Sequence, residues 1–174
     1  MKLFLLLPAL LATISSLAQK KRKVSAYISF NVNATQYDRT ITNNATGFGA
    51  GLQLYIRTKS RIQPVVDISA DVFGGTKELY LDEHNNPIYA KNAVSTVFAG
   101  AGYQSSRQWF ATLTAGPAFF NSHTYAGIKP LFGYYLLKGR QLALKAAFTN
   151  IFQRDATSNQ SFGYWNFYVA VKLF

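Results

Sequence analysis

The chain has 174 residues, enough for one domain of ordinary size. Aromatic residues make up 16% of it and charged residues only 14%, a composition too apolar for a disordered chain and too poor in charge for a typical soluble surface. The sequence contains no cysteine, which excludes a disulfide framework, a thiolate metal site and a cysteine nucleophile. The formal net charge of +11 makes nucleic acid or an anionic surface the partners to weigh.

The first 23 residues read as a leader followed by a basic segment. An apolar run over residues 3–11 precedes Ser16-Leu17-Ala18, whose small residues fit a signal-peptidase site, so we expect a cleaved signal peptide at 1–18. The run is too short for a membrane-spanning helix, which needs about 20 residues, and it lacks the amphipathic pattern of a buried helix. Residues 19–23 form a basic N-terminal segment. This segment resembles a nuclear-localisation signal, but its position behind an export signal favours a solvated collar at a membrane surface.

From Val24 onward, apolar residues recur at every second position, which is typical of strands with one apolar and one polar face. The predicted strands cover residues 24–32, 47–57, 61–72, 93–103, 109–119, 128–136, 142–149 and 162–174. The small residues of 93–103 give that segment no clear face. Glycines on the inner row of 47–57 suit a narrow barrel in which backbones approach closely.

The last strand, 162–174, is the clearest. Its aromatic and β-branched residues favour a strand, and its length suits the 9–11 residues or so that a transmembrane β-strand needs. One row is apolar throughout and is predicted to face outward: Trp165, Phe167, Val169, Val171 and Leu173. We expect this strand to close a barrel by pairing with the first and seventh strands.

Three prolines fall on outward rows, at Pro64, Pro117 and Pro130. Because proline cannot donate to a strand ladder, each predicts a bulge, a bend or a wrong strand count.

The connections alternate between short turns at one end and longer loops at the other, as an even-stranded up-and-down meander requires. In the longest loop, 74–92, apolar residues flank Asn85-Asn86-Pro87 and predict a hairpin with an edge to which another protein could add a strand. The predicted fold is all-β: an eight-stranded antiparallel up-and-down transmembrane β-barrel over residues 24–174.

Basic and acidic residues separate along this barrel. Eleven of the eighteen basic residues fall at the short-turn end: Lys20, Lys21, Arg22, Lys23, Arg57, Lys59, Arg61, Arg107, Lys138, Arg140 and Lys172. The acidic residues lie in the long loops or on the polar rows of strands. A basic ring of this kind can meet anionic lipid headgroups, whereas a nucleic-acid groove would need interleaved stacking aromatics. We therefore expect no nucleic-acid partner.

The alternating strands, the leader, the loop pattern and the terminal Phe174 together resemble the small eight-stranded outer-membrane β-barrels of Gram-negative bacteria, in particular the OmpX/OmpA-like and PorT-like barrel-domain families. The resemblance covers Val24 to Phe174 and implies a location in the cell outer membrane. One departure is Lys172, which occupies the row of Phe174 two places earlier. Either Phe174 lies past the lipid band or a bulge shifts the register near it.

Five charged residues fall on inward rows by this phasing: Arg61, Asp67, Asp71, Lys129 and Lys145. An eight-stranded barrel is just wide enough for side chains to fill it, and buried charges need partners. We therefore predict that these residues pair across the interior as a structural plug. The alternative is a gated or proton-conducting path.

The chain offers no complete catalytic or metal-binding group. Barrel enzymes that deacylate lipid A use a histidine, a serine two residues later and a downstream glutamate. Here His123 is followed by Tyr125, and the only later carboxylate is Asp155. Asp82, Glu83 and His84 could hold a cation but are more typical of a solvated turn. The Asn-x-Thr/Ser triplets at Asn33, Asn44 and Asn159 fall in predicted outer loops, where they indicate only polar composition.

These patterns predict a monomeric integral outer-membrane barrel with no catalytic residue, cofactor or metal. Its expected role is structural or a loop-mediated interaction such as adhesion, rather than that of an open porin. Its expected partners are outer-membrane lipids and, through loop 74–92, extracellular or envelope proteins. Two alternatives stay open: a lipid-modifying barrel enzyme resembling a lipid A deacylase, and a soluble lipocalin-like carrier with its apolar rows turned inward around a ligand.

Overall fold

The computed structural model describes residues 24–37, 44–74, 80–81, 85, 87–88, 93–105, 108–120, 123–137, 139–152 and 161–174. In this part of the chain there are ten strands: β1 (Val24–Tyr37), β2 (Thr46–Ile56), β3 (Ile62–Phe73), β4 (Tyr80–Leu81), β5 (Pro87–Ile88), β6 (Ala93–Gln104), β7 (Trp109–Phe120), β8 (His123–Tyr135), β9 (Leu142–Phe152) and β10 (Phe162–Lys172). None of the described segments is a helix long and apolar enough to cross a membrane. The expected signal peptide (1–18) and basic segment (19–23) lie outside the described residues.

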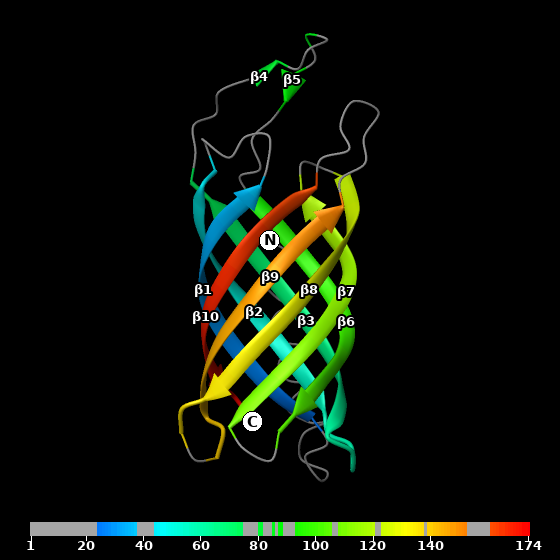
Figure 1. The fold of residues 1–174 in the computed structure, drawn as a ribbon, viewed down its shortest axis with the longest axis vertical. Helices are drawn as coiled ribbons and strands as arrows, with labels where there is room; N and C mark the ends of the chain where they lie inside the picture. The colour runs from blue at the N-terminus through cyan, green and yellow to red at the C-terminus, as the bar shows by residue number, and fades with distance from the viewer. Residues whose placement is uncertain are drawn as a thin grey trace, which may run out of the picture.

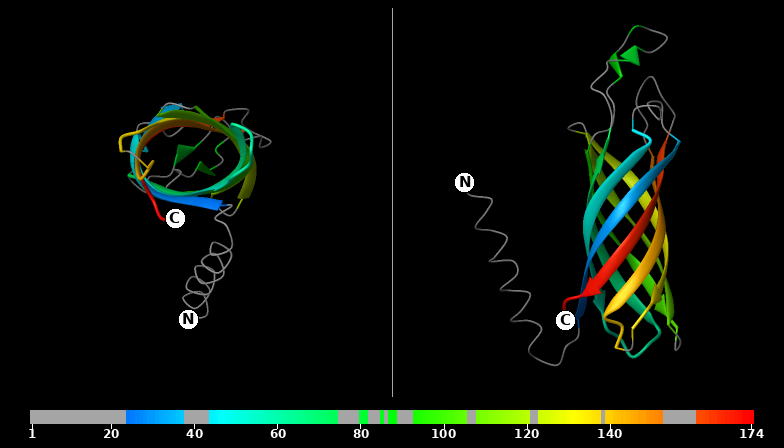
Figure 2. Two further views of the ribbon diagram at one scale, coloured as in Figure 1. Left: turned by 90° about the horizontal axis from the view of Figure 1, so that it is seen from below. Right: turned by 90° about the vertical axis from the view of Figure 1, so that its left-hand side faces the viewer.

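Eight strands close into an antiparallel barrel in the order β1-β10-β9-β8-β7-β6-β3-β2. β1 completes the ring by pairing with both β2 and β10, and the view along the barrel shows the closed ring (Figure 2). The barrel strands are 11 to 14 residues long, well beyond the usual 5–6 or so. The predicted all-β, eight-stranded up-and-down barrel is confirmed, including β1 and β9 as the partners of the last strand.

The small sheet of β4 and β5 lies in the connection between β3 and β6. Tyr80 pairs with Ile88 and Leu81 with Pro87. Asn85, in the turn between them, has a φ of 61°, a left-handed conformation that asparagine tolerates better than most residues. The hairpin predicted within 74–92 is therefore present, and Figure 1 shows it beyond the rim of the barrel, at the end opposite the short turns.

Side chains alternate between the outer face and the barrel interior, which we call the lumen. In β10 the outer row of Trp165, Phe167, Val169 and Val171 is exposed, whereas Tyr164, Asn166, Tyr168 and Ala170 are buried. The predicted facing of the rows is correct here and in the other strands. The facing of β6, for which the sequence shows no clear pattern, is also defined in the structure, because Val94, Thr96 and Phe98 are buried in the lumen.

The two largest differences from the predicted strand boundaries have the same cause. β1 continues past Val32 to Tyr37, and β8 begins at His123 rather than near Ile128. The added stretches are rich in polar and small residues, so they lack the apolar outer row by which strands were recognised. Asn33 nevertheless continues the lumen row of β1, and its side chain is buried there.

The expectation of bulges at the prolines is wrong. Pro64, Pro117 and Pro130 pair with Ala101, Ala126 and Leu113 without a change of register. Each proline points outward within an otherwise paired strand, so the missing N–H costs a ladder bond locally without inserting a residue. A register shift occurs instead in the β1–β10 ladder, between Thr35 and Tyr37.

The end of the chain is bonded to the start of β1. The β10 register is regular to Lys172, which pairs with Tyr27, so the bulge considered there does not occur. Beyond β10, the Leu173 N–H donates to the Ala26 carbonyl at 2.8 Å, and the Ala26 N–H donates to the Phe174 carbonyl at 3.3 Å. Phe174 thus lies just past the last strand.

Candidate functional site

A layer of charged side chains crosses the middle of the lumen. Asp67 and Asp71 project from β3, Lys129 from β8 and Lys145 from β9, and all four are buried. β3 lies opposite β9 in the barrel order, with β8 next to β9. The layer holds two negative and two positive groups, so their formal charges cancel. Buried charges persist only when they are paired and hydrogen-bonded.

One ion pair joins β3 and β8 across the lumen. Lys129 Nζ lies 2.6 Å from Asp67 Oδ1, and the side chains are 1% and 10% exposed. The second carboxylate oxygen of Asp67 accepts from Gln53 Nε2 at 3.1 Å. Lys129 also donates to Ser69 Oγ at 3.3 Å and lies over the ring of Phe98, 5.7 Å from its centroid. These contacts tie β3 to β8 across the lumen, as the plug prediction requires.

Asp71 has neutral partners instead. Its Oδ1 accepts from Asn31 Nδ2 at 2.7 Å and from Asn33 Nδ2 at 2.9 Å. Its Oδ2 accepts from the Tyr164 hydroxyl at 3.0 Å and from Ser69 Oγ at 3.5 Å. Four donors from β1, β3 and β10 therefore compensate the buried carboxylate. Ser69, which bonds both Asp71 and Lys129, links this group to the ion pair.

Lys145 reaches the layer through a side-chain amide. Its Nζ donates to Gln53 Oε1 at 3.0 Å, and the Tyr55 hydroxyl donates to the same oxygen at 3.0 Å. The ammonium also lies over the Tyr168 ring, 5.6 Å from its centroid. Gln53 thus connects Lys145 to Asp67 by accepting from the lysine with one end of its amide and donating to the carboxylate with the other.

Aromatic rings fill the lumen on both sides of the charged layer. We call Tyr27, Tyr55, Phe110 and Tyr135 the turn-end seal; the rings of Phe110 and Tyr135 stack with centroids 4.6 Å apart. Arg140 extends this seal, since its guanidinium lies 5.2 Å from the Tyr135 ring and donates to Gln104 Oε1 and to the Ser105 carbonyl. The lumen at this end is packed with side chains.

The loop-end seal consists of Phe73, Phe120, Phe162 and Tyr164. Phe73 makes edge contacts with Phe162 and Tyr164 at centroid distances of 5.4 and 5.0 Å, and Phe120 lies 6.4 Å from Phe162. All four rings are at most 4% exposed. The charged layer is therefore enclosed between two groups of buried aromatic side chains.

Four of the five charged residues predicted for the lumen are found there. Arg61 is the exception: it is exposed and precedes β3, because the strand begins only at Ile62. Cross-lumen charge pairing is correct for Asp67 with Lys129, whereas Asp71 and Lys145 bond neutral groups. The amides that complete the layer were not predicted: Asn31, Asn33, Gln53 and Asn166, the last of which donates to Asn33 Oδ1 at 2.7 Å. The sequence signal that could have identified these amides is their position on inward rows, level with the aspartates.

The residues weighed for catalysis or metal binding do not assemble within the described part of the chain. His123 is exposed at the start of β8, with its ring 6.1 Å from that of Tyr125. Asp155 and the run Asp82, Glu83 and His84 lie outside the described residues. Among the residues that are described, no group of three histidines or carboxylates could hold a metal ion.

The three Asn-x-Thr/Ser triplets differ from the loop assignment in part. Asn33 lies within β1 and is buried in the lumen, where it donates to Asp71, so its placement in an outer loop is wrong. Asn44 is also buried, directly before β2. Asn159 lies outside the described residues.

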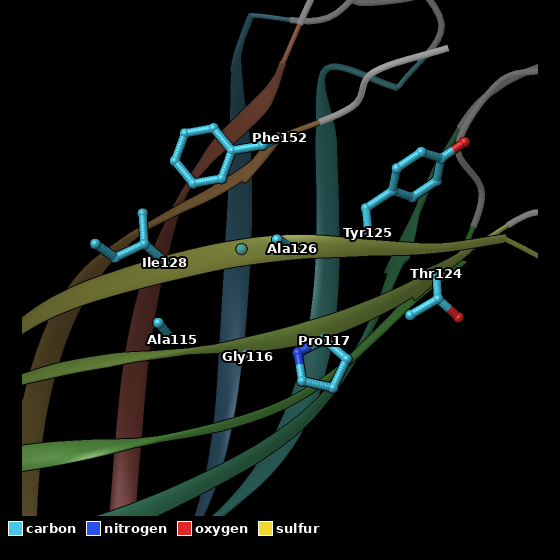
Figure 3. Close-up of a pocket in the computed structure, with 9 residues that line it drawn as sticks. Ala115, Gly116, Pro117, Thr124, Tyr125, Ala126, Ile128 and Phe152 are labelled. Carbon is cyan, nitrogen blue, oxygen red and sulfur yellow. The ribbon is translucent and has the colours of Figure 1, made fainter.

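The outer face of the barrel is apolar and carries shallow hollows. Phe30, Phe48 and Val32 are 67%, 67% and 62% exposed. One hollow of about 510 Å³ lies where small residues of β7 and β8 sit between larger ones (Figure 3). It is lined by Ala115, Gly116, Pro117, Thr124, Tyr125, Ala126, Gly127, Ile128 and Phe152. A contiguous apolar surface of this kind is rare on soluble monomers and is typical of a surface that contacts protein or lipid.

Gly49 gives a direct test of the Asp71 group. It pairs with Asn31 on one side and Asp71 on the other. A Cβ at this position would lie 2.1 Å from Asp71 Oδ1 and 2.6 Å from the Ala70 carbonyl oxygen. Gly49→Ala is therefore expected to displace the carboxylate from its donors and lower the free energy of unfolding by about 1–3 kcal/mol, the usual cost of overpacking. Urea unfolding of the lipid-reconstituted protein measures it.

Gly51→Ala is the matched control, since Gly51 occupies the same row of β2. Its Cβ would approach other atoms no closer than 3.2 Å. We expect a clearly smaller loss, and equal losses in the two variants would contradict the role assigned to Gly49.

Comparisons with known proteins identify the fold and no family. No family model matches the chain, and no curated protein matches it in sequence. The crystal structure of Ail, the attachment invasion locus protein of Yersinia pestis, is similar with a TM-score of 0.56 at 8% identity, over 86% of this chain and 97% of that one. Ail in a phospholipid bilayer nanodisc gives 0.55 at 8% identity, over 86% and 99%. A de novo designed transmembrane β-barrel gives 0.51 at 11% identity, over 86% and 95%. The shared property is the small eight-stranded barrel of outer-membrane proteins.

Proposed function

We propose that this chain is an integral outer-membrane protein with a sealed barrel, which presents its long connections for structural or adhesive interactions at the cell surface. The observation that carries the proposal is the polarity of the barrel. Charged and amide side chains fill the lumen, and large apolar side chains cover the outside. Barrels of outer membranes have an apolar band facing lipid and a polar interior.

The same polarity argues against the alternative of a soluble lipocalin-like carrier. A lipocalin-like protein would turn its apolar rows inward around a ligand and its polar rows toward water. Here Asp67, Lys129 and Lys145 occupy the lumen, and rows such as Phe30 and Val32 face outward. Exposing that band to water would cost about 25 cal/mol for each Å² of apolar surface, which lipid contact removes.

The two aromatic seals argue against the alternative that the barrel is an open porin. Eight strands leave an interior just wide enough for side chains to fill, and in this chain rings occupy it at both ends of the charged layer. A barrel of this kind serves as a rigid, closed support. The functional surface then lies in the connections at the end opposite the short turns, where the β4–β5 hairpin is found.

An adhesive role has a parallel among similar barrels. Ail is named as an attachment invasion locus protein, and it has been crystallised in complex with the heparin analogue sucrose octasulfate. The present chain shares the barrel that holds the Ail loops, so a loop-mediated interaction is the role that we propose for it.

Cell fractionation tests the location. The protein is expected in the outer-membrane fraction, and the unboiled sample is expected to migrate differently from the boiled one on a gel, because a closed barrel resists detergent unfolding. Recovery as a soluble periplasmic protein would contradict the proposal.

Trypsin treatment of intact cells tests which end faces outward. Lys77 and Lys91 belong to the connection that holds the hairpin, whereas Lys59 and Arg61 belong to a short turn. We expect cleavage after Lys77 or Lys91 on intact cells and cleavage after Lys59 or Arg61 only once the outer membrane is permeabilised. Mass spectrometry of the released peptides distinguishes these sites, and the reverse pattern would place the hairpin inside.

A further inference from the structure

The two tryptophans of the chain lie toward opposite ends of the outer face. Trp109 begins β7 at the short-turn end, with its ring 5.4 Å from Tyr103 and 6.1 Å from Phe132. Trp165, on β10, packs at 5.0 Å against Phe148, which lies 6.0 Å from Tyr37 toward the other end. Aromatic residues gather at the two water interfaces of a membrane barrel. These groups therefore bracket the apolar band.

We call Tyr103, Trp109, Phe132 and Tyr134 the turn-end belt. Trp109 and Tyr134 are paired across β7 and β8, and the Tyr134 hydroxyl donates to Gln108 Oε1. Phe132 and Tyr134 are 56% and 45% exposed. The belt thus presents an apolar surface with the Tyr134 hydroxyl and Gln108 at its edge, the form of a site for a molecule with an apolar body and a polar head.

An arginine lies directly beside this belt. Arg61 is exposed, and its Nη1 lies 3.5 Å from the Tyr103 hydroxyl. The backbone that carries it is fixed, because the Gln104 N–H donates to the Arg61 carbonyl at 2.9 Å. Lys59 is exposed in the same turn. The guanidinium and a phenolic hydroxyl are therefore held at the polar edge of the belt, where they can bind the same anion.

Among the described residues, no aspartate or glutamate lies at this end; the carboxylate there is that of the C-terminal Phe174, which is bonded to the start of β1. Asp67 and Asp71 are buried in the lumen. The remaining five carboxylates belong by sequence to the connections β1–β2, β3–β6 and β9–β10, which leave the barrel at the opposite end: Asp38, Glu78, Asp82, Glu83 and Asp155. No aspartate or glutamate among the described residues pairs with Arg61, so an anion from outside the chain can supply its counter-charge.

We infer that Arg61, Tyr103 and the turn-end belt bind the headgroup of an anionic phospholipid in the leaflet at the short-turn end. The phosphate lies against the guanidinium and the Tyr103 hydroxyl, and the acyl chains lie along Trp109 and Phe132. Arginine suits a phosphate because its planar fork offers parallel N–H donors. This inference rests on the proposed membrane location and adds a lipid class and a position on the barrel.

Tryptophan quenching tests the site, with each tryptophan used alone. In Trp165→Phe the reporter is Trp109, and in Trp109→Phe it is Trp165. Each variant is reconstituted in mixed phosphatidylcholine and phosphatidylglycerol vesicles in which either lipid carries brominated chains at the same mole fraction. Bromine on phosphatidylglycerol is expected to quench Trp109 more strongly than bromine on phosphatidylcholine. If one cation attracts the anionic lipid, phosphatidylglycerol should be enriched about fivefold over phosphatidylcholine beside Trp109. Trp165 should be quenched equally by both.

Arg61→Gln in the Trp165→Phe background is expected to remove the preference, and Arg61→Lys to retain part of it. Arg57→Gln is the matched control, because Arg57 occupies the other side of the same turn and bonds Ser25 Oγ at 3.0 Å. It should leave the preference in place. Equal quenching of Trp109 by the two lipids, or equal effects of Arg61→Gln and Arg57→Gln, would overturn the site. If no brominated lipid quenched either tryptophan, the membrane location itself would fail, which is a separate result.

Discussion

Replacing Asp67 with asparagine is expected to lower the free energy of unfolding by about 3–5 kcal/mol, the usual cost of removing one partner of a buried ion pair. Asp67 is the carboxylate 2.6 Å from Lys129, and that lysine is 1% exposed. Without it the lumen would hold Lys129 and Lys145 against Asp71 alone, an excess of one buried positive charge. Urea unfolding in lipid vesicles, followed by the gel shift between folded and unfolded forms, measures the loss.

The double variant Asp67→Leu with Lys129→Met separates charge from packing. It removes one charge of each sign and leaves Asp71 and Lys145 to balance, so most of the lost stability should return. Lys59→Gln, at an exposed position, controls for the loss of a charge as such and should have no measurable effect. If the double variant were no more stable than Asp67→Asn, the charge imbalance would not be the cause.

Phe162→Ala is expected to cost about 3–5 kcal/mol, as large-to-small changes in a packed core do. The Phe162 ring is fully buried and lies between Phe73, at 5.4 Å, and Tyr164, at 5.0 Å. Phe30→Ala is the control, since Phe30 is 67% exposed on the outer face and its removal leaves no internal cavity. Comparable losses in the two variants would contradict the division into a packed lumen and a lipid-facing surface.

A solute would have to pass both seals in turn, so channel conductance gives a second test of the packed lumen. Wild type should show no single-channel steps in a planar bilayer, and neither should a variant truncated only in the loop-end seal. Conductance should require truncation of both seals, for example Phe162→Ala together with Phe110→Ala. Large steps in the wild type would show that the lumen is an open pore.

Much of the barrel follows from the sequence because one physical constraint repeats along it. Each strand has one face against the packed lumen and one apolar face outside, so a period of two appears wherever the outer row is large and apolar. The row from Trp165 to Val171 is an example, and its facing is correct. Where that row becomes small or polar, as in β1 after Val32, the signal disappears although the strand continues to Tyr37.

The partners of the lumen charges could not be predicted in the same way. Alternation places Asp71 in the lumen but says nothing of which strands lie within reach across it. The register then brings Asn31 opposite Gly49 and Gly49 opposite Asp71. Because Gly49 has no side chain, Asn31 can reach the carboxylate and donate to it at 2.7 Å. Specific pairing of this kind depends on three strands at once, which a pattern along one strand does not contain.

Whether the outer face of this barrel lies in lipid is tested most directly by spin labels, because the chain has no cysteine of its own. Single variants Phe30→Cys, Leu113→Cys and Phe167→Cys place a nitroxide on three strands of the outer face, and Lys59→Cys places one in a short turn. In reconstituted vesicles the first three labels should collide readily with oxygen and rarely with a water-soluble nickel complex, and the Lys59→Cys label should do the reverse. High accessibility of the outer-face labels to the nickel complex would contradict a transmembrane barrel.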